Sequence, residues 1–79
     1  MTTLPTRLEV RAEMVASVQT VLITAGEQVD AGATLVILES MKMEIPVLTE
    51  ISGVVAEIAV APGDVIHEGD LIAVIDHRS

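Results

Sequence analysis

Short runs of β-branched and aliphatic residues recur along the chain, and turn-forming residues separate each run from the next. The clearest runs cover residues 18–23, 34–39, 54–60 and 71–75. Valine and isoleucine are enriched in strands, and no segment has the caps and the periodicity of a long helix. The pattern therefore predicts an all-β protein.

The sequence also repeats itself. When it is shifted by 37 positions, without a gap, identical residues meet at Glu13 and Glu50, Val18 and Val55, Gly26 and Gly63, and Gly32 and Gly69. Conservative matches fill many of the positions between them. Because glycine tolerates the positive φ of tight turns, each half corresponds to strand, turn, short strand, turn and strand.

Two equivalent halves predict eight short strands in two four-stranded antiparallel sheets, packed face to face as a flattened barrel or sandwich with a pseudo-twofold axis. The chain has 79 residues, 51% of them hydrophobic, which suits one small domain with a thin core. It has no Phe, Tyr or Trp, so the core must be aliphatic. We expect residues 1–8 to form a flexible tail and residues 9–79 to form the domain.

The repeat predicts where Lys42 lies. It follows the matched part of the first half by three residues, and its counterpart 37 positions later is Ser79, the last residue. We therefore expect a protruding turn with Lys42 at one end of the domain and the two termini at the other end. Pro46 follows the lysine, and proline within a strand is tolerated at a sheet edge or a bulge, which places the region beside solvent.

Met41 and Met43 flank this lysine. An exposed lysine on a turn is usually only solvated, but apolar neighbours are unusual where turn chemistry favours Asn, Gly or Asp. Adaptable apolar side chains at such a position suit recognition by another protein. The alternative is that the two methionines pack back onto the edge of the sandwich.

Charge and composition exclude several classes of protein. The net charge of −8 repels nucleic acid and anionic lipid surfaces, so the acidic residues serve solubility or a basic protein partner. The longest apolar run, residues 71–75, has five residues, far below the ~20 of a membrane span. The chain has no cysteine, which fits a reducing cytoplasm and excludes disulfides and thiolate metal sites.

No motif of an enzyme is present. The chain has neither a phosphate-binding glycine loop nor a nucleophile elbow, and Ser40 has no paired base in the sequence. His67 and His77, without cysteine nearby, make a poor metal pair, and we expect both to be surface residues. The sequence predicts no catalytic residue and no metal site.

Across residues 9–76 the chain resembles the biotinyl domain of the biotin carboxyl carrier family. The resemblance is carried by Met41-Lys42-Met43, by the upstream Glu39, and by Gly53, Gly63-Asp64 and Gly69-Asp70 in the second half. Ser40 replaces the alanine that is usual before the first methionine. No inserted loop of the kind found in some bacterial acetyl-CoA carboxylase carriers fits between Ile23 and Gly26.

The resemblance implies a carrier and not a catalyst. Biotin would be attached covalently to Lys42 by a biotin protein ligase, with Glu39, Met41 and Met43 as recognition residues. The loaded arm would then carry a carboxyl group between a biotin carboxylase and a carboxyltransferase. We expect a cytoplasmic carrier that is a monomer when free.

Two alternatives remain at this stage. Lipoyl domains share the fold and the hairpin lysine, but they typically have aspartate before the lysine and alanine after it, where this chain has Met41 and Met43. The other alternative is a non-catalytic adaptor in which Lys42 is unmodified. The acceptor of the carboxyl group is not encoded in any feature of the sequence.

Overall fold

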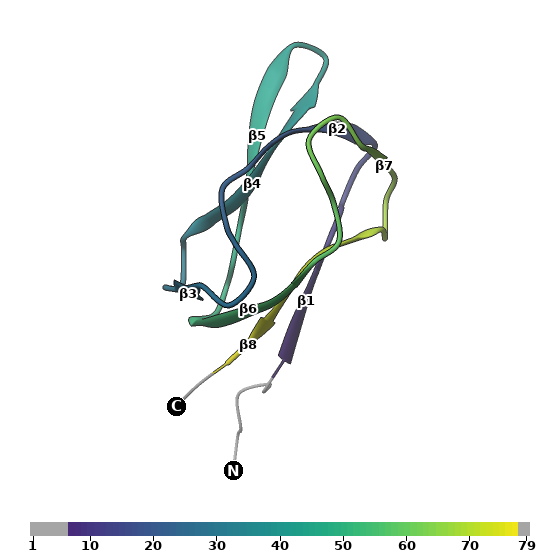
Figure 1. The fold of residues 1–79 in the computed structure, drawn as a ribbon. Coiled ribbons are helices and arrows are strands. Elements are labelled where there is room, and N and C mark those ends of the chain that lie inside the picture. Colours follow the sequence, from purple (N-terminus) through teal and green to yellow (C-terminus); the bar gives the residue numbers. More distant parts are fainter. Residues whose placement is uncertain (1–6, 78–79) are drawn as a thin grey trace.

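A computed structural model describes residues 7–77, and this part of the chain contains eight strands and no helix. Strands follow one another along the chain with short connections (Figure 1). They are β1 (Arg7–Arg11), β2 (Ala16–Val21), β3 (Gln28–Val29), β4 (Thr34–Ser40), β5 (Met43–Leu48), β6 (Gly53–Ile58), β7 (Val65–Ile66) and β8 (Leu71–Asp76).

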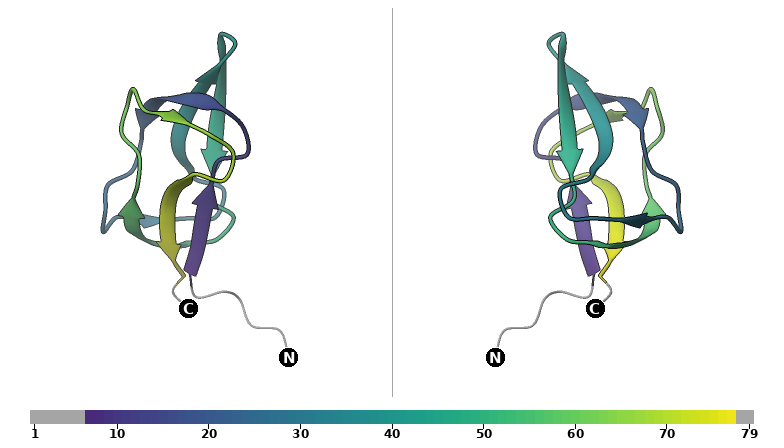
Figure 2. Two further views of the ribbon diagram at one scale, coloured as in Figure 1. Left: turned by 90° about the vertical axis from the view of Figure 1, so that its right-hand side faces the viewer. Right: turned by 90° about the vertical axis from the view of Figure 1, so that its left-hand side faces the viewer.

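The strands form two four-stranded antiparallel sheets, with the orders β1-β8-β6-β3 and β5-β4-β2-β7. The sheets lie against each other as two layers (Figure 2). Each half of the repeat contributes two strands to each sheet, so neither half contains a complete sheet of its own. The predicted all-β sandwich of two four-stranded sheets is confirmed.

The pseudo-twofold relation extends to the register of every strand pair. Ala16 pairs with Ile66 in one sheet, and the equivalent residues 37 positions away, Gly53 and Val29, pair in the other. The bulges are repeated as well, because β2 and β6 each skip one residue at equivalent points of their pairing with β4 and β8. The predicted repeat is therefore a repeat of hydrogen-bonded structure.

The four glycines of the repeat occupy the turns that the sequence predicts. Their φ angles are between 90° and 95°, a region that side chains with a Cβ rarely adopt. The Gly26 N–H donates to the Val55 carbonyl oxygen at 2.7 Å, and the Gly63 N–H donates to the Val18 carbonyl oxygen at 2.8 Å. Each of these turns therefore binds a strand of the opposite half.

The core between the sheets is aliphatic, as the composition requires. Its most deeply buried side chains are Val18, Leu35, Val36, Val55, Ile72 and Ile75. Burying one such side chain stabilises the fold by about 1.5 to 3 kcal/mol. The one buried polar side chain among the described residues, Thr49, has its hydroxyl satisfied because it donates to the Ile51 carbonyl oxygen at 2.7 Å.

Two boundaries differ from the sequence prediction. Strand β1 begins at Arg7, and Leu8 packs half-buried against the core, so these two residues of the expected tail belong to the first strand. Residues 1–6 lie outside the described part of the chain. Strands β2 and β6 end two residues earlier than predicted, because the chain leaves the sheet while Ile23 and Val60 still pack on the core.

The hairpin formed by β4 and β5 protrudes at one end of the sandwich (Figure 1). At the opposite end Arg7 of β1 pairs with Asp76 of β8, so the two ends of the described chain lie side by side. Pro46 lies within β5, which is an edge strand, as a proline in a strand requires. These positions agree with the prediction from the repeat.

Replacing Gly53 with alanine should destabilise the fold by about 3 kcal/mol, the upper range for overpacking a tight site. A Cβ at this position would overlap the Asp76 carbonyl oxygen and lie 2.7 Å from its carbonyl carbon, and backbone atoms cannot move aside cheaply. Urea unfolding measures the change. Ala16→Gly at the equivalent position is the control and should cost about 1 kcal/mol or less; equal losses for both variants would contradict the close approach.

Candidate functional site

The hairpin between β4 and β5 closes through a turn of only two residues. Ser40 pairs with Met43, so Met41 and Lys42 are the two central residues of the turn. Their φ angles are 52° and 66°, and they are the two non-glycine residues with positive φ in the described part of the chain. Positive φ at both central positions is the left-handed turn that suits the twist of a β-hairpin, usually built from Asn and Gly.

Non-glycine residues in this backbone region are strained by roughly 1 to 2 kcal/mol each. Strain of this kind persists only where the surrounding structure imposes it, and it gathers at functional sites. Here the pairing of the two long strands imposes it. The turn that carries the predicted attachment residue is therefore a place where the fold holds two side chains in an unfavourable conformation.

Lys42 is exposed at the tip of this turn, as the sequence predicts. Among residues 7–77 it takes part in no ion pair and no side-chain hydrogen bond. Its amine is neither buried nor engaged, so it is accessible to a modifying enzyme.

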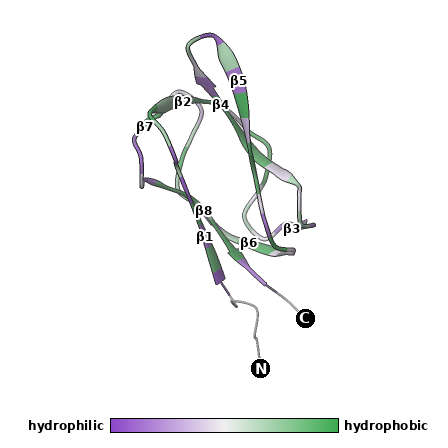
Figure 3. Ribbon diagram, turned by 180° about the vertical axis from the view of Figure 1, so that it is seen from behind, coloured by the Kyte–Doolittle hydropathy of each residue, from purple (hydrophilic) through white to green (hydrophobic). Residues whose placement is uncertain are grey.

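The methionines on either side are also exposed. Met41 is 91% exposed and Met43 is 62% exposed, so neither packs back onto the edge of the sandwich. The hydropathy colouring in Figure 3 shows this mixture of apolar and polar residues at the tip of the hairpin. Apolar side chains this exposed lose contact with water only when another molecule covers them, which fits a recognition surface.

Glu39 lies on β4, three residues before the lysine, with its side chain exposed. It accepts a long hydrogen bond of 3.4 Å from the Gln19 side chain on β2. Across the hairpin it faces Glu44 of β5 as its direct partner. Two carboxylates on directly opposed residues destabilise a sheet, so this pair is unfavourable for the isolated fold.

The pseudo-twofold provides an internal comparison for this pair. The positions equivalent to Glu44 and Glu39 are Arg7 and Asp76, and there the Arg7 Nε lies 3.0 Å from the Asp76 Oδ1. The same cross-strand position therefore holds a complementary ion pair at one end and two acids at the end with Lys42. Sequence analysis identified Glu39 but missed Glu44, whose significance appears only once the register of β4 and β5 is known.

Other candidate residues stay outside this site. His67 is exposed, as predicted, whereas His77 is half-buried and its Nδ1 donates to the Ser52 carbonyl oxygen at 2.9 Å. Within the described residues no group of three or more His, Cys, Asp or Glu side chains could hold a metal ion. The same residues include no helix that is long and apolar enough to cross a membrane.

Comparison with known proteins identifies the family to which this hairpin belongs. The family model described as "Biotin-requiring enzyme" matches residues 8–75. A biotinylated protein TB7.3 homolog of Mycobacterium leprae is 58% identical over 67 residues, which are 85% of this chain and 94% of that protein. A biotin/lipoyl attachment protein of Bacillus subtilis is 40% identical over 65 residues, covering 82% and 89% of the two chains.

Solved structures agree with the sequence relatives. The urea carboxylase of Kluyveromyces lactis matches 95% of this chain with a TM-score of 0.83 and 31% identity, and the match spans 7% of that enzyme. The lipoyl domain of the 2-oxoglutarate dehydrogenase complex from Azotobacter vinelandii matches with a TM-score of 0.72 and 31% identity, over 82% of each chain. The protein belongs to the biotin/lipoyl attachment family.

Glu44→Arg should stabilise the isolated protein, because it converts the like-charged pair into a complementary one. A gain of about 0.5 kcal/mol is expected for an exposed cross-strand pair, which raises the melting temperature by roughly 2 to 4 °C in a domain of this size. Arg7→Glu at the equivalent position should lower it by a similar amount. If neither substitution shifts the thermal melt at low salt, the two cross-strand pairs contribute nothing to the stability of the fold.

Proposed function

We propose that the protein is a biotin carboxyl carrier, biotinylated on Lys42. The observation that supports this most directly is the geometry of the hairpin, which exposes an unpaired lysine between two exposed methionines on a two-residue turn. Relatives that align over most of the chain are named as biotinylated proteins. The chain itself is not a catalyst under this proposal, but the substrate of a ligase and then a carrier.

Attachment requires an amine that a ligase can reach. The Lys42 Nζ would attack the carbonyl carbon of a biotinyl adenylate and form an amide bond. The bond between that carbon and the phosphate oxygen would break, so that AMP leaves with the electron pair, and the amine would lose a proton. Met41 and Met43 would supply the apolar contact with the ligase, and Glu39 a charged one. A turn that protrudes from both sheets fits into a concave active site without unfolding the domain, which avoids an ordering cost at each docking.

Bound biotin supplies a ring nitrogen that can carry a carboxyl group. This chain would present the group alternately to a biotin carboxylase, which uses ATP and bicarbonate, and to a carboxyltransferase, and these substrates imply a location in the cytoplasm. Amide formation removes the charge of Lys42, so the net charge of −8 becomes −9, and the carried carboxylate makes it −10. The likeness to the urea carboxylase chain supports a carboxylase partner, and we expect the free carrier to be a monomer.

A lipoyl carrier is the second candidate, since the lipoyl domain from Azotobacter vinelandii is as similar in sequence, at 31% identity, as the urea carboxylase. Its TM-score of 0.72 is below the 0.83 of the carboxylase, and the methionines around Lys42 favour biotin. The third candidate is an adaptor in which Lys42 is unmodified. Intact-mass spectrometry of protein from its native host distinguishes them, because biotinyl, lipoyl and unmodified chains differ in mass.

Lys42→Arg should abolish labelling by a biotin protein ligase, detected with streptavidin, while the thermal melt stays within about 1 °C of the parent protein. An exposed turn residue without partners contributes little to stability, so the two readouts should separate. Persistent labelling of the variant would place the biotin elsewhere. A large drop in melting temperature would show that Lys42 is structural.

Met43→Glu should slow the ligase reaction by about tenfold, which corresponds to a loss of roughly 1.4 kcal/mol of apolar contact with the enzyme. Leu22→Glu is the matched control, because Leu22 is 50% exposed and its backbone bonds to Leu35, at the end of β4 away from the hairpin tip. Initial rates of biotin incorporation measure the effect. Equal rates for the two variants would mean that the ligase does not contact Met43.

A further inference from the structure

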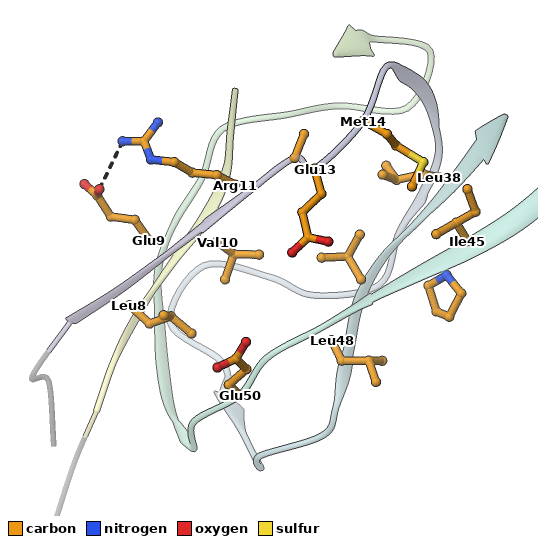
Figure 4. A pocket seen from close by; sticks show the side chains of 13 residues that line it. Leu8, Glu9, Val10, Arg11, Glu13, Met14, Leu38, Ile45, Leu48 and Glu50 are labelled. Carbon is orange, nitrogen blue, oxygen red and sulfur yellow. Dashed lines mark hydrogen bonds and ion pairs between the residues drawn. The ribbon is translucent and has the colours of Figure 1, made fainter. Parts of the chain in front are cut away.

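A groove runs between β1 and β5, one edge strand from each sheet (Figure 4). Its volume is about 410 Å³. The two strands are equivalent by the pseudo-twofold relation, so the axis of the repeat passes through the groove. Residues 39–44 of the hairpin do not line it, which separates it from the site of Lys42.

Nine of the thirteen residues that line the groove are apolar, including Leu8, Val10, Leu38, Ile45, Val47 and Leu48, and its exposed surface is about equally polar and apolar. Two carboxylates project into the groove, from Glu13 after β1 and from Glu50 after β5 (Figure 4). Both side chains are exposed, and within residues 7–77 neither forms a hydrogen bond or an ion pair. They are therefore free acceptors for a cation.

The arginine that lines the same groove does not neutralise them. Arg11 Nη2 lies 3.0 Å from the Glu9 carboxylate, and its Nη1 donates to the Gly69 carbonyl oxygen at 2.9 Å. The charges of Glu9 and Arg11 thus neutralise each other. Glu13 and Glu50 are left as the uncompensated charges of the groove.

The internal repeat shows that these two acids are unusual. Within the described residues the two halves are identical at five superposed positions, Val10/Val47, Glu13/Glu50, Val18/Val55, Gly26/Gly63 and Gly32/Gly69. The valines pack in or against the core, and the glycines have positive φ. Packing and backbone geometry account for those four identities. They do not account for two exposed glutamates, whose role is therefore solubility or an interaction outside the chain.

We propose that the groove binds an extended segment of a partner protein in which an arginine or lysine stands between apolar residues. The apolar residues of the groove would cover the apolar neighbours of this arginine or lysine, and the two carboxylates would receive its cation from both sides. The open edge of β1 can pair with an added strand. On β5, Pro46 has no backbone N–H and so interrupts the row of hydrogen-bond donors. A second copy of this chain is disfavoured, because it would bring a further net charge of −8 to the same acids.

This inference rests on the proposed function only for the biological use of the groove. A carboxylase that held the carrier by the groove would fix the body of the domain while Lys42 stayed free to move between active sites. Binding to the groove itself does not need biotin. Its test therefore uses unmodified protein, and Lys42→Arg should bind as the parent chain does, so failure here is separable from failure of biotinylation.

The experiment is a titration of ¹⁵N-labelled protein with the capped tripeptide Val-Arg-Val, followed by amide shifts at low salt. Shifts are expected in β1, in β5 and around Glu13 and Glu50. The matched probe Val-Glu-Val should shift these amides at least about fivefold less at equal concentration. The double variant Glu13→Gln, Glu50→Gln should lose most of the preference for arginine, and the control Glu57→Gln, Glu68→Gln, at two exposed acids outside the groove, should keep it.

Three results would overturn the proposal. Equal shifts by the two peptides would show an apolar surface that is indifferent to charge. Shifts confined to the hairpin would place the basic peptide on Glu39 and Glu44 instead. Shifts of the groove amides on simple dilution of the protein, without effect of either peptide, would assign the groove to a second copy of the chain.

Discussion

The interlocked pairing of the two halves is the constraint on which the rest of the structure depends. β1 and β3 of the first half pair with β8 and β6 of the second, while β5 and β7 of the second half pair with β4 and β2 of the first. Each half alone has only one pair of strands, β2 with β4 or β6 with β8, and neither four-stranded sheet is complete until both halves are present. Two-stranded pairs are marginally stable at best, so neither half is stabilised alone. The turns strengthen this dependence, because the N–H groups of Gly26 and Gly63 each donate to a strand of the other half.

This pairing also dictates the geometry at Lys42. The chain must pass from one half to the other at the end of β4, and the register of β4 with β5 leaves only two residues for the crossing. A two-residue hairpin requires left-handed backbone at both positions, whatever side chains stand there. The strain at Met41 and Lys42 is therefore imposed by the long strands, and it keeps the lysine at the tip instead of folded against a sheet.

Much of this architecture can be predicted from the sequence, because a repeat of 37 residues without gaps constrains strand number, turn positions and the place of the hairpin together. Arg7 and Leu8 were missed as strand residues, since their partners in β8 lie almost 70 positions away and leave no local pattern. Glu44 was missed for a different reason, because only the register of β4 with β5 shows that it faces Glu39. The identity of Glu13 and Glu50 was visible, but the groove they share arises only when β1 and β5 become neighbouring edges.

Pseudosymmetry separates structural from functional residues in this chain, because each half serves as a reference for the other. Features that both halves share and that are buried or fixed by backbone geometry, such as Gly26 and Gly63, are explained by folding. Features that differ, such as two acids where the other end has an ion pair, are not required by the fold.

Two features of this chain are not explained by folding. One is the pair of acids at the hairpin, which differs from the equivalent ion pair, and the other is the pair of shared but exposed acids in the groove. They occupy different parts of a rigid sandwich whose core contacts involve neither. A charged group can therefore be changed at the tip or in the groove with little effect on folding, which lets one small domain present chemistry at its end and a docking surface on its side.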